Sequence, residues 1–158
     1  MTIQEFRQLE IDRFIQEHPT IPHPESFFRN PKKYNDKTAN GLTQLVIRYI
    51  KFIGGQAERV SSSGRPIDRT KEVKDYIGRT YKIGSIEWIP STSTNGTADV
   101  SATIKGRSVK VEVKIGNDRM SDNQKKYKGN VEAAGGIYMI AKTFEQITTD
   151  INHLIETL

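Results

Sequence analysis

The sequence predicts a mixed α/β fold in which a central mixed β-sheet is flanked by helices. Apolar residues recur at helical spacing over residues 2–17, 39–53 and 143–158. Residues 96–114 instead alternate apolar and polar side chains, as two strands joined by a tight turn do. A helix and another strand after this hairpin imply a sheet with both antiparallel and parallel neighbours, covered by helices.

Composition limits the class of protein. A chain of 158 residues, 27% of them charged, is long enough for one domain with a real core. The absence of cysteine excludes disulfides and thiolate metal sites. No apolar run approaches the roughly 18 residues of a membrane span, and the charged N-terminus lacks the apolar stretch of a signal peptide. We therefore expect a cytoplasmic protein that does not contact the membrane.

The N-terminal part is predicted to be a helix over residues 2–17, capped by Thr2, followed by a Pro-rich linker to residue 38. The linker contains four prolines, and three aromatic residues are expected to hold it on the domain: Phe27, Phe28 and Tyr34. We therefore predict two parts, residues 1–38 and a main domain at 39–158.

The main domain begins with a helix over 39–53, which Gly54 and Gly55 end. Residues 65–85 are basic and weakly patterned, and no element is predicted there except a strand beginning at Ser85 that carries Trp88 as a core residue. The other predicted elements are a strand at 56–61, a helix from its N-cap Ser121 to about 134, a strand at 137–141 and a last helix from Thr143.

The hairpin at 96–114 has a register that its own pattern predicts. A two-residue loop at Lys105-Gly106 places Val100 opposite Val111 and Asp99 opposite Glu112. The apolar residues then share one face, and the other carries Asp99, Lys110, Glu112 and Lys114. A slip of one residue would mix the two faces, which supports this register.

Opposed carboxylates in a sheet repel each other, because their Cβ atoms lie only about 4.5–5.5 Å apart. A hard divalent cation between Asp99 and Glu112 would relieve this repulsion. Lys114 points to the same side and would stabilise negative charge or orient a water molecule. The alternative is a surface ladder of salt bridges without catalytic function.

Positive charge is concentrated around this hairpin. Between Arg59 and Lys128 lie 15 of the 24 Lys and Arg residues but only 8 of the 19 acidic residues. Such a distribution suits a phosphate backbone, although basic surfaces without this function are common. The best candidates for phosphate contacts are Arg59, Arg65, Arg119, Lys125 and Lys126.

The order of elements and the polar residues together resemble the PD-(D/E)XK nuclease superfamily, and within it the VRR-NUC group, many of whose members are phage-derived. The matching residues are Gly96-Thr97-Ala98-Asp99, Glu112-Val113-Lys114, Gln124 and Gly135-Gly136-Ile137-Tyr138. The resemblance covers residues 39–145. It implies a restriction-endonuclease-like core and a hydrolase found in a bacterium or a phage-infected host cell.

By this resemblance, Asp99, Glu112 and the backbone carbonyl of Val113 would bind Mg²⁺ or Mn²⁺. Lys114 would position the attacking water or stabilise the phosphate, and Gln124 would face the same cleft. The implied activity is a metal-dependent DNA endonuclease acting on branched or nicked DNA, such as a Holliday junction.

One departure from the family leaves an alternative open. Family members often carry a Glu near the start of the first core helix, but no Glu occurs at 39–57, where Asn40 and Gln44 stand instead. A second metal site is therefore in doubt. The alternative is a non-catalytic nucleic-acid-binding module that retains the nuclease fold.

We also expect a homodimer, because two copies related by a two-fold axis would cut both strands of a duplex or junction symmetrically. The helix at 2–17 either reaches a neighbouring subunit or packs on its own domain.

Overall fold

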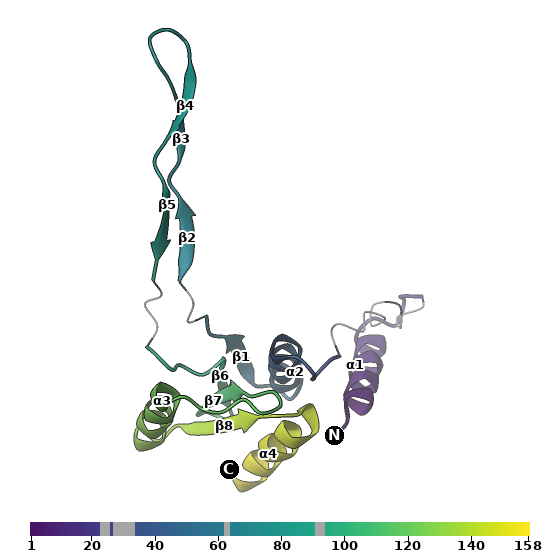
Figure 1. The fold of residues 1–158 in the computed structure, drawn as a ribbon. Helices are drawn as coiled ribbons and strands as arrows, with labels where there is room; N and C mark the ends of the chain where they lie inside the picture. The colour runs from purple at the N-terminus through teal and green to yellow at the C-terminus, as the bar shows by residue number, and fades with distance from the viewer. Residues whose placement is uncertain (23–25, 27–33, 62–63, 91–93) are drawn as a thin grey trace. The chain divides into compact units, whose positions relative to one another are not determined.

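The computed structural model describes residues 1–22, 26, 34–61, 64–90 and 94–158 (Figure 1). The chain forms two compact units, one made of Met1–Val60 with Gly96–Leu158 and the other of Ser61–Asn95. This division does not coincide with the boundary predicted after residue 38. Phe27 and Phe28, predicted to lie on the domain, fall outside the described residues.

The first unit is built on a four-stranded mixed sheet, as predicted. Its strands are β1 (Gln56–Arg59), β6 (Val100–Ile104), β7 (Arg107–Val113) and β8 (Ile137–Ala141), in the order β1-β6-β7-β8. The first two pairs are antiparallel and β7 pairs with β8 in parallel. Strand β7 is therefore central, with a neighbour on each side.

The hairpin β6–β7 has the predicted register. Val100 lies opposite Val111, and Ile104 lies opposite Arg107. Lys105 and Gly106 both have positive φ, 48° and 77°, as the two central residues of a type I′ turn require. This turn matches the twist of the strands and fixes which face each side chain takes.

Three helices cover the apolar face of the sheet: α1 (Ile3–Glu17), α2 (Ala39–Phe52) and α4 (Phe144–Thr157). Phe6 of α1 is fully buried, with its ring centroid 5.6 Å from that of Tyr49 and 5.2 Å from that of Phe144. Helix α1 therefore packs on its own unit, which was one of the two alternatives for it. Tyr34, predicted to hold the linker on the domain, donates a hydrogen bond to Glu10 of α1.

Helix α3 (Asp122–Ala133) lies on the opposite face of the sheet. The ring of Tyr127 meets that of Tyr138, which points to this face from β8, at 6.3 Å between centroids. Ser121 and Gln124 form a capping box at the start of α3. None of the residues of α3, all of which the structure describes, is buried. In the described ranges, no helix is long and apolar enough to span a bilayer.

The second unit contains three strands that the sequence did not predict. Its strands are β2 (Arg65–Asp68), β3 (Lys71–Lys74), β4 (Thr80–Ile83) and β5 (Ile86–Ile89), of which only β5 was expected. They pair as β2–β5 and β3–β4. The prediction that Trp88 is a core residue was wrong, because 63% of its surface is exposed. No residue of these four strands, all of which the structure describes, is buried, so they lack the alternation that reveals a half-buried strand.

Candidate functional site

Two of the predicted site residues, Glu112 and Lys114, lie at the end of β7, on the face of the sheet that α3 covers. Glu112 and Lys114 are only 2% and 6% exposed, although both are ionisable. This pair therefore does not lie in a surface ladder of salt bridges. Burying charge is costly unless each charge has partners, so the contacts of these two side chains decide what the site can do.

Lys114 has three acceptors for its three N–H groups. Its Nζ lies 3.1 Å from Glu112 Oε1 and 3.2 Å from Asp118 Oδ2, and it donates to Gln124 Oε1 at 3.0 Å. Burial alone would lower the pKa of Lys114, but the bonds to Glu112 and Asp118 outweigh it and raise this pKa. The side chain is thus a fixed positive charge beside Glu112.

Gln124 connects the two members of this pair through the capping box of α3. Its Oε1 accepts from the backbone N–H of Ser121 at 2.9 Å as well as from Lys114, and its Nε2 donates to Glu112 Oε1. Because the capping box fixes the amide, the helix start determines where Glu112 and Lys114 can lie. The structure brings Glu112, Lys114 and Gln124 together.

Asp99 stands one residue before β6, half-buried, and its Oδ2 accepts a hydrogen bond from the backbone N–H of Val113 at 2.9 Å. It therefore continues the β6–β7 ladder with a side-chain oxygen. Burial raises the pKa of Glu112; the hydrogen bond from Lys114 opposes this rise, and the nearby charge of Asp99 adds to it. The charge of Asp99 thus disfavours ionisation of Glu112.

Tyr138 is a site residue whose role the sequence did not reveal. It was singled out as part of the Gly135-Gly136-Ile137-Tyr138 run, and its side chain is buried. Its hydroxyl donates to Glu112 Oε2 at 3.5 Å. Burial and the charge of Glu112 raise the pKa of Tyr138, so the phenol keeps its proton at neutral pH. Parallel pairing sets Lys110 beside Tyr138, and sequence spacing alone cannot give that register.

Gly96 allows the segment that carries Asp99 to approach α3. Its φ is +82°, and a Cβ atom there would lie 2.4 Å from the backbone carbon of Asn123 and 2.7 Å from the nitrogen of Gln124. Both the conformation and the close contact require glycine. The contact places the start of α3 beside the segment that leads to Asp99.

The predicted phosphate-contact residues are spread over both units. Arg59 ends β1 opposite Val100, and its Nη1 donates to Asn40 Oδ1 at 2.6 Å. It therefore lies at the same end of the sheet as Asp99. Arg119 precedes α3 and is exposed, as are Lys125, which pairs with Asp122 at 3.0 Å, and Lys126 on the helix. Arg65 belongs to the second unit.

Within the described residues, Asp99 and Glu112 each have one carboxylate oxygen with little or no hydrogen bonding, and such oxygens are suitable ligands for a hard cation. In the described part of the chain, Asp99 Oδ1 has no hydrogen bond, and Glu112 Oε2 has only the long contact to Tyr138. Among the described residues, no three or more His, Cys, Asp and Glu side chains are placed so that they could hold a metal ion together. Mg²⁺ is usually bound by one or two carboxylates together with water and substrate phosphate, so this pair fits it.

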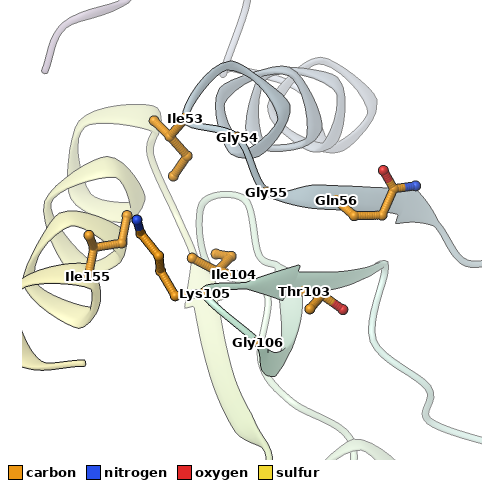
Figure 2. Close-up of a pocket in the computed structure, with 9 residues that line it drawn as sticks. All are labelled: Ile53, Gly54, Gly55, Gln56, Thr103, Ile104, Lys105, Gly106 and Ile155. Atoms are coloured by element: carbon orange, nitrogen blue, oxygen red, sulfur yellow. The ribbon is translucent and has the colours of Figure 1, made fainter.

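A cavity of about 450 Å³ lies at the other end of the hairpin, between the end of α2, the β6–β7 turn and α4. Figure 2 shows the side chain of Lys105 extending across it toward Ile155. Lys105 is the sole ionisable residue of its lining, in which every residue is described. The cavity therefore has no pair of groups for acid–base or metal chemistry.

No protein-family model matches this chain, and no curated protein matches it. Its own residues must therefore indicate its function.

Proposed function

We propose that this protein is a metal-dependent DNA endonuclease of the PD-(D/E)XK type, resembling the VRR-NUC group. One observation carries the proposal. A buried Glu112–Lys114 pair and Asp99 meet at the end of one hairpin, with Asp99 Oδ1 and Glu112 Oε2 least engaged by the protein. A purely structural ion pair needs no second carboxylate, whereas two carboxylates are a common ligand set for a divalent cation.

Asp99 and Glu112 would hold Mg²⁺ or Mn²⁺, and the Val113 carbonyl is a third candidate ligand. In a ladder, the N–H and C=O of one residue face the same neighbouring strand. Because the Val113 N–H bonds to Asp99, the carbonyl is expected on that side as well. A bound divalent ion would polarise the phosphate and lower the pKa of a bound water.

Lys114 would balance negative charge at the scissile phosphate. All of its N–H groups already have acceptors, so a phosphate would have to replace one of them. Asp118 is the partner most easily replaced, because its side chain is exposed while those of Glu112 and Gln124 are held by the fold. Gln124 would keep Glu112 Oε1 occupied, which leaves Oε2 for the cation.

The substrate that we propose is DNA, branched or nicked in keeping with the resemblance. The excess of Lys and Arg between residues 59 and 128 supports a phosphate-rich partner. Arg59, Lys125 and Lys126 are exposed in the unit that contains the site. We propose that they hold the backbone on either side of the bond to be cut.

The test is nicking of supercoiled plasmid with Mg²⁺, with Mn²⁺ and with chelator. We expect metal-dependent nicking by the natural sequence and loss of nicking by Asp99→Asn and Glu112→Gln. The matched control is Asp150→Asn, an exposed carboxylate on α4, which covers the opposite face of the sheet. Nicking at the natural rate by either site variant at saturating metal would contradict the proposal.

A non-catalytic nucleic-acid-binding module remains the second candidate, and one contact favours it. Where the family often has a Glu on the first core helix, Asn40 accepts a hydrogen bond from Arg59. An amide held by a cation does not recruit a second metal ion. DNA binding without cleavage of plasmid, nicked duplex or four-way junction would favour this candidate over the first.

A further inference from the structure

The second unit is one continuous two-stranded ribbon. Asp68 lies opposite Ile86 in β2–β5, and Lys71 lies opposite Ile83 in β3–β4. Two residues separate these pairs on each strand, so the same register runs through both ladders. Figure 1 shows the pair β3–β4 following the pair β2–β5 along the same two strands of chain. The ten residues from Arg65 to Lys74 span about 33 Å at roughly 3.3 Å per residue.

The ribbon exposes large apolar side chains along its whole length. Two-thirds of the large apolar residues that are exposed in the described chain lie on it: Tyr76, Ile77, Tyr81, Ile83, Ile86 and Trp88. Scattered exposed apolar residues are normal, but a concentration of them on one element indicates a binding surface.

The tip of the ribbon is fixed in shape. Asp75 Oδ1 accepts hydrogen bonds from the backbone N–H groups of Ile77 at 2.9 Å and Arg79 at 2.8 Å, and Gly78 has a φ of +83°. Tyr76 is held at this turn with 98% of its surface exposed. A preorganised tip would present an aromatic ring to a partner with little loss of entropy on binding.

The charge of the ribbon is positive, with six Lys and Arg residues and four acidic residues between 61 and 95. Three of the acids are engaged locally: Asp68 by Thr70, Asp75 by the tip and Glu87 by Arg69. Among the described residues, five of the six cations have no ion pair: Arg65, Lys71, Lys74, Arg79 and Lys82.

We propose that this ribbon binds nucleic acid, its cations contacting phosphates and its exposed aromatic rings contacting bases; the proposal rests on DNA being the partner of the protein. Cations interleaved with aromatic rings are the combination that holds a nucleic-acid strand. A two-stranded ribbon also fits the major groove of a duplex. A second copy of the chain suits the ribbon less well, because the core of a protein interface is depleted of lysine.

Trp88 gives a direct test, because it is the single tryptophan of the chain and lies on the ribbon. A short DNA duplex and its single strand are each titrated into the full-length protein in chelator, where cleavage cannot occur. Binding is followed by anisotropy of labelled DNA and by the emission of Trp88. We expect the emission of Trp88 to change in parallel with binding, and the probe that produces the change identifies the form of DNA bound.

Two variants test the interaction. Tyr76→Ala should weaken binding by about five- to a hundredfold, the loss expected for one stacked base, without lowering stability. The double substitution Lys71→Gln/Lys82→Gln should reduce the slope of log affinity against log salt by about 0.9 for each phosphate that the protein no longer neutralises. The matched control is Lys51→Gln/Lys105→Gln, two exposed lysines of the first unit, which should leave the slope unchanged.

The proposal is overturned if neither probe binds at low salt, if Trp88 emission stays constant at saturation, or if both variants bind as the control does. It is also overturned if light scattering gives a dimer that Tyr76→Ala converts to monomer, because the ribbon then binds a second copy. Plasmid nicking separates the two proposals. If the protein nicks plasmid but the ribbon variants bind DNA as the natural sequence does, only the ribbon proposal fails. If the ribbon variants bind DNA more weakly but the protein nicks no plasmid, only the nuclease proposal fails.

Discussion

Toward its C-terminal end, strand β7 is buried on both faces, but by different chemistry. Val109, Val111 and Val113 face the apolar core, where α1, α2 and α4 cover them. At the end of the strand, Glu112 and then Lys114 face the side where α3 begins, and their charged groups bond to each other and to Gln124. One strand thus supports the stability of the domain on one face and its candidate chemistry on the other.

The two faces differ in how substitutions on them change the stability of the fold. Apolar packing is non-directional, so the loss of methyl groups costs a transfer term and a cavity term and leaves no charge unpaired. The polar face depends on specific partners, because a buried charge that loses its partner keeps the whole cost of its desolvation. Substitutions that are similar in size should therefore have different effects on the two faces, and their pH dependence should differ as well.

The largest loss of stability is expected from a substitution on the apolar side, where α1 covers the core. Phe6→Ala removes a fully buried ring that packs against Tyr49, Phe52 and Phe144. We expect the free energy of unfolding to fall by about 4 kcal/mol, independently of pH. Urea unfolding followed by circular dichroism measures this, since Trp88 reports on the second unit only. A loss below about 1 kcal/mol would mean that α1 does not belong to the core.

The second-largest loss of stability is expected on the polar face of β7. Lys114→Met keeps the length of the side chain but leaves Glu112 buried without its cation, and should cost about 3 kcal/mol at neutral pH. Because burial raises the pKa of Glu112 in the folded state, this cost is present above that pKa and shrinks as the pH falls toward the unfolded value. Unfolding curves at several pH values test the slope.

The control for this prediction is the double variant Glu112→Gln/Lys114→Met, which removes both charges. It should recover most of the lost stability and abolish the pH dependence. If the single variant lost the same stability at every pH, packing of the Lys114 chain rather than the charge of Glu112 would be responsible.

The elements of the first unit could be predicted because each has a local signal. The Lys105-Gly106 turn and the strict alternation around it set the register of β6–β7. The ribbon could not be predicted in the same way, since β3 and β4 bury no continuous face and carry charged or polar residues on both sides. Hydrophobic periodicity arises where one face of an element is buried, and the strands of the ribbon have almost no buried face.

The site was only partly predictable for a related reason. Strand alternation was enough to put Glu112 and Lys114 on one side of the sheet. Their burial depends on α3 and on Tyr138 of β8, which long-range packing brings to the same place. Strand alternation alone therefore gives no reason to expect a stability cost when either side chain is removed, whereas the buried contacts predict such a cost for Lys114.

A smaller effect is expected for Val111→Ala on the apolar face. The substitution deletes two buried methyl groups and should lower the free energy of unfolding by about 1–3 kcal/mol at all pH values. Ser108→Ala, an exposed residue of the same strand, is the control and should change stability by less than about 0.5 kcal/mol. An unchanged melting temperature for Val111→Ala would show that its side chain does not face the core.

The smallest effect on stability, together with complete loss of function, is expected for Asp99→Asn. The amide oxygen can still accept the hydrogen bond from the Val113 N–H, so we expect a change in stability below about 1 kcal/mol. The substitution removes the charge that contributes to the raised pKa of Glu112. Its loss favours the ionised Glu112 in the folded state and partly offsets any loss of stability.

Cation binding, by contrast, loses one of its two carboxylates in Asp99→Asn. Calorimetric titration with Mn²⁺ should therefore detect binding to the natural sequence and to Asp150→Asn but none to Asp99→Asn, and only the first two should nick plasmid. Mn²⁺ binding that survives Asp99→Asn with unchanged affinity would mean that the cation does not lie between the two carboxylates, and the polar face of β7 would then be an ion-pair network that serves the fold alone.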